Sequence, residues 1–284
     1  MAIITISRGC FSHGKEIAER VAERLNYECI SREILIEASR FFHVSEKGLI
    51  KCMEKEPSIL DRITHGREKY LTYIKAALLE HVKSGNVVYH GHAGHLLLKG
   101  IPCVLKIRIV AAMKERIRFL SDKEQITAKE AVKRILAEDR KRANWTKYIY
   151  KKDINDTTFY DLVIRIQSLT IDDACNIICN AASSPHLDTK RNHYHEKLSD
   201  LTISTHVRAA LAEIYDVKVS CKNGIVHIKV PTQKIRKNDY ITPYMQSEIK
   251  DQLHGDMVRK IAEIAKTVPA VKDVICDIEM PYYH

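Results

Sequence analysis

The stretch from Ile3 to Leu25, IITISRGCFSHGKEIAERVAERL, constrains the fold of this chain more than any other. Its first residues, Ile3–Ser7, form a nearly continuous apolar run, which is typical of a strand buried on both faces. From Lys15 to Leu25 the apolar residues recur at helical spacing and predict an amphipathic helix. A strand, a turn with two glycines and a helix in this order indicate an α/β fold with a parallel sheet.

The turn between this strand and helix has the pattern of a phosphate-binding loop. Gly9 to Lys15 match G-x-x-x-x-G-K, but Glu16 stands where a Ser or Thr would contact Mg²⁺. In such a loop the backbone N–H groups converge at the positive end of a helix, and the lysine reaches the phosphates. The alternative is a plain turn with a solvated Lys15. Glu16 fits either case, since it could ligate Mg²⁺ or simply complement the helix dipole.

The pattern of strands and helices divides the chain into two predicted domains. Residues 1–184 alternate strand and helix signals and predict a parallel sheet with helices on both faces; the strands lie at 3–7, 86–90, 103–109 and 161–166, and the helices at 15–25, 32–42, 45–54, 58–65, 67–84, 128–142 and 170–182. Residues 185–197 lose apolar periodicity and are interpreted as a linker.

Residues 198–284 predict a smaller α+β domain. A helix at about 200–213 precedes two short strands, which Asn223-Gly224 joins as a hairpin. Residues 231–254 are polar and are expected to be irregular, and a helix at about 256–267 precedes a last strand.

Charge and cysteine content restrict the environment and the partners. The chain has 284 residues and a net charge of +10, and the segment Lys106–Lys152 holds 15 Lys or Arg against 6 Asp or Glu. Such a block indicates a phosphate-rich partner, or else a solvated helix face. No apolar run approaches the ~20 residues of a membrane helix, and no signal peptide is recognised. Eight cysteines without C-x-x-C pairs favour reduced thiols, so we expect a cytoplasmic protein.

Two further clusters permit more than one interpretation. His90, His92 and His95 have a spacing at which imidazoles could converge on Zn²⁺, although structural or pocket histidines are the favoured interpretation. Trp145 and the nearby tyrosines could stack on bases of single-stranded nucleic acid, or could pack against the fold and cover a small ligand.

Five segments in order resemble the cytidylate kinase-like family of nucleoside monophosphate kinases: the opening ITISRGCFSHGKEIAERVAERLNYECISREIL, then VVYHGHAGHLLL, VLKIRIVAAMKERI, EDRKRANWTKYIY and FYDLVIRIQSLTIDDACNII. The resemblance spans residues 1–182. It implies a P-loop fold and transfer of the γ-phosphoryl group of ATP, with Mg²⁺, to a nucleotide acceptor similar to CMP or dCMP. Because phosphoryl transfer is mostly positioning and charge stabilisation, Lys and Arg would be the main catalytic side chains.

The resemblance also implies roles for particular residues. The donor phosphates would be bound by Gly9, Cys10, Phe11, Ser12, His13, Gly14, Lys15 and Glu16, with Glu16 also a metal ligand. The catalytic residues would be Lys15, Arg116, Asp139 and Arg142, and the acceptor would be bound by Arg32, Arg40 and His92. Glu16 is common in the family, but Ser31 and His92 stand where the family usually has Asp and Arg. These departures leave the acceptor open.

The predicted C-terminal domain is similar to a BON domain over residues 198–280, and the polar segment 231–254 interrupts the similarity. BON domains are thought to bind phospholipid surfaces or small ligands, so a small molecule, a lipid surface or self-association is expected here, and the chain could be a homo-oligomer. The expected function is therefore a nucleotide kinase. The alternative is a catalytically weak nucleotide-binding regulator that uses the BON-like domain for output. Nucleic acid is the least favoured partner, because the kinase lid accounts for the basic block.

Overall fold

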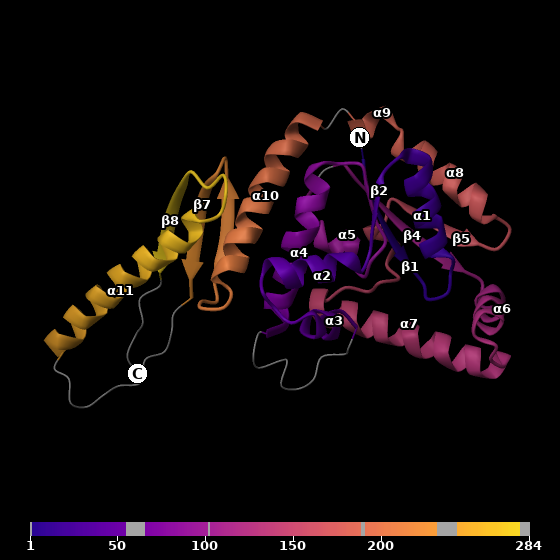
Figure 1. Cartoon of the computed structure of the whole chain (residues 1–284), viewed down its shortest axis with the longest axis horizontal. Helices are drawn as coiled ribbons and strands as arrows, with labels where there is room; N and C mark the ends of the chain where they lie inside the picture. The colour runs from indigo at the N-terminus through magenta and orange to yellow at the C-terminus, as the bar shows by residue number, and fades with distance from the viewer. Residues whose placement is uncertain (1, 55–65, 102, 189–190, 232–242, 279–284) are drawn as a thin grey trace. The chain divides into compact units, whose positions relative to one another are not determined.

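A computed structural model describes residues 2–54, 66–101, 103–188, 191–231 and 243–278. The chain divides into two compact units between His195 and Glu196 (Figure 1). This boundary lies inside the segment 185–197, which was interpreted as a linker, and part of that segment is helical. The segment holds α9 (Pro185–Asp188) and the first turns of α10 (Arg191–Leu211). The sequence did not predict this part of α10 as helix because residues 195–197 are all exposed. A helical turn that buries no side chain has no apolar stripe by which it could be recognised.

The N-terminal unit is built on a five-stranded sheet in the order β2-β3-β1-β4-β5. The strands are β1 (Ile3–Arg8), β2 (Glu28–Ile30), β3 (Val87–Tyr89), β4 (Val104–Ala111) and β5 (Leu162–Ile166). Every pairing is parallel, so the predicted parallel sheet is confirmed. The strand β2 was not predicted, since it has three residues and two of them are exposed.

Helices cover both faces of this sheet, as predicted. They are α1 (Gly14–Leu25), α2 (Glu33–Phe41), α3 (Glu46–Glu54), α4 (Gly66–Lys83), α5 (Gly94–Leu97), α6 (Met113–Glu124), α7 (Ala128–Tyr150) and α8 (Ile171–Ala182). On one face Ile4 and Ile6 pack in a core with residues of α1 and α8. On the other face α5 lies close to Thr5, because a Cβ on Gly94 would be 3.5 Å from the Cβ of Thr5. The helix predicted at 58–65 lies outside the described residues.

The helices α6 and α7 depart most from the sequence prediction. The capping box of Thr127 and Glu130 is present at the start of α7, but the helix continues to Tyr150 instead of ending near 142. Its last turns gain tertiary contact: Trp145 is 2% exposed and its Nε1 donates to the carbonyl of Cys52 at 2.7 Å. The helix α6 was missed because only Arg116 and Leu120 are buried on it. Figure 1 shows α7 running past the carboxyl end of β1.

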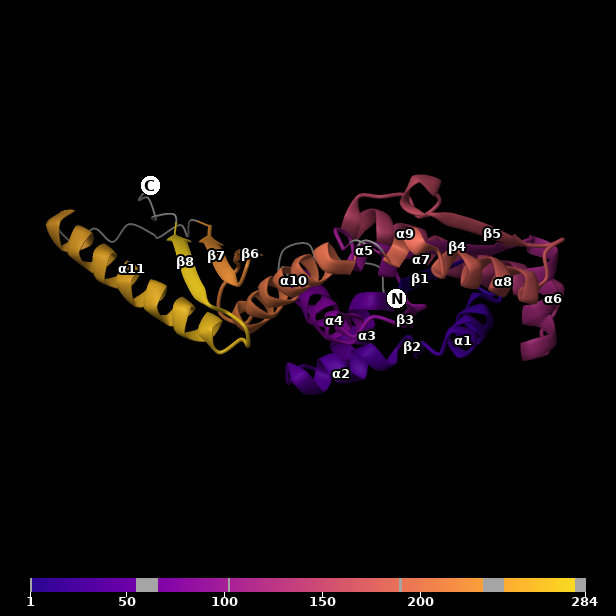
Figure 2. The ribbon, with the colours of Figure 1, turned by 90° about the horizontal axis from the view of Figure 1, so that it is seen from above.

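The C-terminal unit has a three-stranded sheet in the order β6-β7-β8. The strands β6 (Lys218–Lys222) and β7 (Ile225–Val230) form the predicted antiparallel hairpin, and β8 (Asp273–Ile278) pairs parallel to β7. Residues of α10 and α11 (Pro243–Lys266) share one core with the sheet. Figure 2 shows both helices on the same side of the strands. The expectation of irregular structure up to 254 is wrong from Pro243 onward, where α11 begins.

Two general properties can be checked against the structure. All eight cysteines are free, so no thiol is engaged in a disulfide. Among the described residues, we find no helix with both the length and the apolar character required for a membrane span.

Candidate active site

The loop between β1 and α1 has an uncommon backbone conformation at two residues. Phe11 and His13 adopt left-handed conformations, with φ of 55° and 62°. This conformation is uncommon for residues with a Cβ, and such strain is often found at functional sites. Gly14 is required for close packing, because a Cβ there would lie 2.6 Å from the Cβ of Arg8. The Ser12 hydroxyl donates to the carbonyl of Gly9 at 2.9 Å, so this side chain stabilises the turn.

A half-buried ion pair connects the loop to α6 and α7. Arg116 is 8% exposed, and its Nε donates to the carbonyl of Cys10 at 2.8 Å. Its Nη2 donates to Asp139 Oδ2 at 2.6 Å, and Asp139 Oδ1 accepts from the backbone N–H of Cys10 at 3.2 Å. Burial, followed by the Asp139 carboxylate, raises the pKa of the Cys10 thiol to about 12. In this geometry Arg116 and Asp139 fix the loop in place, which is a positioning role distinct from the catalytic contact expected from the sequence.

A cavity of about 300 Å³ opens on the loop and α1. It is lined by Arg8, Cys10, Phe11, Ser12, His13, Gly14, Lys15, Glu16, Glu19, Phe119, Lys123, Glu138 and Arg142. Of the predicted phosphate-binding residues only Gly9 is absent from this lining. The side chain of Lys15 is 63% exposed, with its Nζ 3.5 Å from Glu19 Oε1. A weak exposed pair of this kind leaves the lysine able to turn toward an anion in the cavity.

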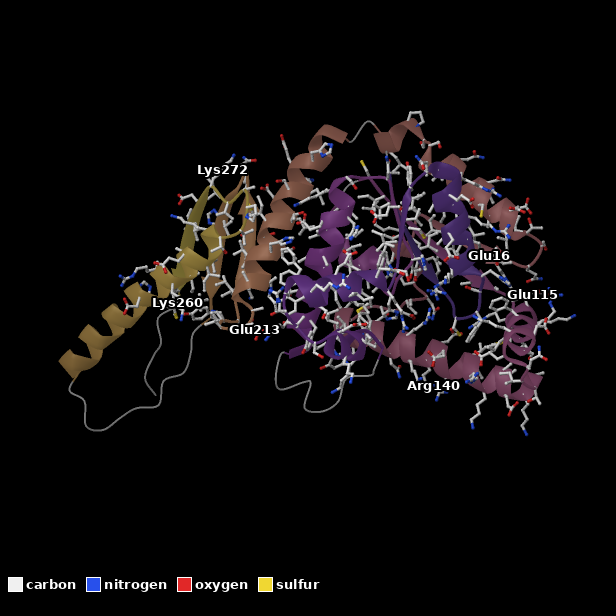
Figure 3. All side chains as sticks on the ribbon, viewed as in Figure 1. Glu16, Glu115, Arg140, Glu213, Lys260 and Lys272 are labelled. Carbon is white, nitrogen blue, oxygen red and sulfur yellow. The ribbon has the colours of Figure 1, made fainter. Side chains whose placement is uncertain are left out.

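Glu16 lies at the start of α1, as Figure 3 shows. Its carboxylate accepts from Arg20 at 2.7 Å and lies 3.5 Å from His13 Nδ1. A metal ion would compete with Arg20 for this carboxylate, so a role as metal ligand stays a prediction. Glu16, Glu19 and Glu138 nevertheless all line the cavity, and carboxylate oxygens are a chemistry that suits Mg²⁺ bound mainly by phosphates.

A second cavity, of about 480 Å³, lies beside the carboxyl ends of β1 and β3. Two of the three predicted acceptor residues, Arg32 and His92, line it, whereas Arg40 does not. Its wall has an apolar part and a basic part. The apolar residues are Ile34, Leu35, Met53, Tyr89 and Trp145, and the basic residues are Arg8, Arg32, Lys141 and Arg142.

Arg8 and Arg142 line both cavities. Arg142 Nη1 donates to the carbonyl of Arg8 at 3.0 Å, which anchors α7 at the end of β1. Burial, followed by the positive charge of Arg142, lowers the pKa of Arg8 to about 10, and Arg32 acts in the same direction. The charge of Glu19 acts in the opposite direction on Arg8, and Glu138 also lines both cavities, so the shared wall carries charges of both signs. Sequence analysis missed Arg8, although an arginine at the end of a buried strand directly before the loop was a usable signal.

The three histidines do not form a metal site. Within the described ranges no group of three or more His, Cys, Asp or Glu side chains could hold a metal ion. Burial is the largest cause that lowers the pKa of His90 to about 4 and that of His92 to about 3, so both are neutral near pH 7. The His92 ring contacts Trp145 edge-on, with the centroids 4.3 Å apart. Trp145 therefore packs inside the fold and is not an exposed platform for bases.

Other arginines of the basic block face away from the cavities. Arg134 pairs with Glu124 on the surface, and Arg140 is exposed on α7, where Figure 3 labels it. Neither of them lines either cavity.

A central strand followed by a glycine-containing loop and a helix, beside two adjoining cavities, is the arrangement of a P-loop kinase-like fold. The chain belongs to the cytidylate kinase-like family, whose model matches residues 3–168. It is 27% identical over 180 residues to the cytidylate kinase of Pyrobaculum islandicum, covering 62% of this chain and 90% of that protein. It is 28% identical over 186 residues to the cytidylate kinase of Staphylothermus marinus, covering 63% and 94%.

The fold also matches a solved structure of an uncharacterized protein from Eubacterium ventriosum. The TM-score is 0.50 at 19% identity, and the match covers 65% of this chain and 99% of that one. At this identity the likeness concerns the fold alone.

Proposed function

We propose that this protein transfers the γ-phosphoryl group of ATP to a nucleoside monophosphate, with an acceptor similar to CMP or dCMP. The observation that carries the proposal is the pair of adjoining cavities that share Arg8 and Arg142. A group that passes from a donor in one cavity to an acceptor in the other would therefore pass near these two arginines and Glu138, which also lines both cavities. Relatives that are cytidylate kinases support the choice of a pyrimidine nucleotide.

The donor cavity would hold the phosphates of ATP. Backbone N–H groups of the turn from Phe11 to Gly14, at the N-terminus of α1, would supply positive dipole ends. Lys15 would turn from Glu19 to the phosphates, adding a full positive charge. Glu16, with Glu19 and Glu138, would hold Mg²⁺ in this cavity, and the ion would supply positive charge that neutralises the phosphates.

The acceptor cavity separates charge from apolar surface, as a nucleotide requires. Its arginines would bind the acceptor phosphate, while Tyr89 and Trp145 offer apolar wall for the base and sugar. A neutral His92 adds no charge there, so its imidazole can exchange hydrogen bonds with an uncharged base. Arg8 and Arg142 would then hold the two phosphates in line and stabilise the charge that spreads over the transferring group.

The test is turnover of ATP and Mg²⁺ against CMP, dCMP, UMP, AMP and GMP by the full chain. We expect turnover within the usual kinase range, roughly 1–100 s⁻¹, on one or two pyrimidine acceptors. Lys15→Ala should lose ATP binding in calorimetry, and Lys129→Ala, an exposed lysine outside both cavities, should not. Tight ATP binding by Lys15→Ala would refute the assignment of the loop. Binding of ATP without turnover on any acceptor would favour a nucleotide-sensing regulator.

A further inference from the structure

The sheet of the C-terminal unit buries only one of its faces. Val226, Ile228 and Val230 of β7 point into the core with α10 and α11. The alternate residues point the other way and are exposed or partly exposed; they are Lys218, Ser220, Lys222, Ile225, His227, Lys229, Asp273, Ile275 and Asp277. Ile225 is 39% exposed and Ile275 is 47% exposed. We call these nine residues the outer sheet face.

Charges on the outer sheet face are separated by edge. The edge strand β6 carries Lys218 and Lys222, and the other edge strand, β8, carries Asp273 and Asp277. The register places Lys218 in one cross-strand row with Asp277 and Lys222 in another row with Asp273. Lys229, on the central strand, lies 3.3 Å from Asp277. One edge is therefore positive and the other negative, and the central strand between them carries Ile225, His227 and Lys229 on this face.

We propose that the outer sheet face binds the same face of a second copy of this chain. A two-fold axis parallel to the strands, between two stacked sheets, brings β6 of each copy over β8 of the other. Lys218 then faces Asp277 of the second copy, and Lys222 faces its Asp273. Ile225 meets its own counterpart at the axis, and its exposed apolar surface is buried there. Lys229 also meets its counterpart, and each of these lysines keeps Asp277 of its own sheet as its countercharge. An axis perpendicular to the strands would instead oppose lysine to lysine and aspartate to aspartate.

The charge pattern favours a second copy over an anionic membrane. Three lysines and two aspartates give this face a net charge of only +1 with His227 neutral, and the aspartates would be repelled by acidic lipid headgroups. A face of three short strands is also smaller than the roughly 800 Å² per partner of a standard stable interface. The association should accordingly be weak and should decrease as salt rises.

A charge-swap experiment on the full chain tests this pairing by sedimentation velocity over a range of concentrations. The double variant Lys218→Asp/Lys222→Asp makes both edges negative, and Asp273→Lys/Asp277→Lys makes both edges positive. Each variant alone should associate at least about tenfold more weakly than the wild type, because like charges now face each other. An equimolar mixture should associate again, since the two altered faces complement each other.

The matched control is Lys260→Asp/Lys266→Asp, which makes the same charge change at exposed positions of α11. It should associate as the wild type does. Thermal unfolding verifies that each variant is folded. A variant that does not fold is replaced by a milder one at the same positions, with Lys→Gln on β6 or Asp→Asn on β8. These milder variants should weaken association less than the charge swaps. A monomeric wild type, swapped variants that associate normally, or folded swapped variants that fail to associate when mixed would each overturn the proposal. So would lysine-dependent binding of the monomeric chain to phosphatidylserine vesicles.

Discussion

Replacing Asp139 by Asn separates a positioning role from a catalytic one. The carboxylate accepts from Arg116 at 2.6 Å and from the Cys10 amide at 3.2 Å, and its side chain is 35% exposed. A hydrogen bond to a charged group contributes about 1.5–3 kcal/mol when buried, and partial exposure screens it. Asn keeps one acceptor but leaves the buried Arg116 without a countercharge. We therefore expect a loss of about 2 kcal/mol in the free energy of unfolding.

The assay combines urea unfolding with steady-state kinetics at several ATP concentrations. Because the carboxylate fixes the loop backbone at Cys10, the KM for ATP should rise together with the loss of stability. The control is Asp172→Asn, which breaks exposed pairs with Arg20 and Arg24 and should lower stability by less than about 1 kcal/mol. Unchanged stability with a large fall in kcat would refute the positioning role and restore a direct catalytic contact.

Two further predictions concern other parts of the chain. Burial, then the charge of Arg108, lowers the pKa of His95 from 6.5 to about 4, so between these values the unfolded chain binds a proton that the folded chain does not. The free energy of unfolding should therefore fall as pH falls through this window, and His95 alone should account for a loss of about 2 kcal/mol at pH 5. Urea titrations at pH 7 and pH 5 measure this loss, and in the variant His95→Asn the contribution of His95 should be absent. In the C-terminal unit Asp200 accepts from the backbone N–H groups of Asn223 at 3.0 Å and Gly224 at 3.2 Å. Asp200→Ala should destabilise this unit by about 2 kcal/mol, measured as faster amide exchange in β6 and β7, whereas unchanged exchange would show that the hairpin does not need this carboxylate.

Local signals in the sequence were sufficient for much of the fold. The apolar run of β1 and the apolar stripe of α1 predicted the central strand and its helix. A helix that buries one side repeats its apolar residues at helical spacing, and a strand that is buried on both faces is apolar throughout. The Asn223-Gly224 pair predicted the hairpin through its turn geometry. The second half of α7 was not predictable in this way. It is stabilised by the contact of Trp145 with Cys52, which are distant in sequence.

The candidate site was predictable in its loop and less so in its arginines. The glycine spacing located the turn that lines the smaller cavity, and close packing against Arg8 requires a glycine at position 14. The sequence could not distinguish arginines that face a cavity from those that hold the fold. Arg116 points to Cys10 and Asp139, while Arg8 faces both cavities, and only tertiary packing determines which way each guanidinium turns.

The burial of Arg8 beside Arg142 also ties the stability of the protein to the anions in solution. Burial of the Arg8 charge, and then the charge of Arg142, disfavour the folded state until an anion binds beside them, and the unfolded chain offers no such site. By mass action, an anion at ten times its dissociation constant would stabilise the folded chain by about 1.4 kcal/mol. Melting temperatures measured in phosphate buffer should thus exceed those in an amine buffer of equal ionic strength, and neutralising Arg8 would reduce that difference.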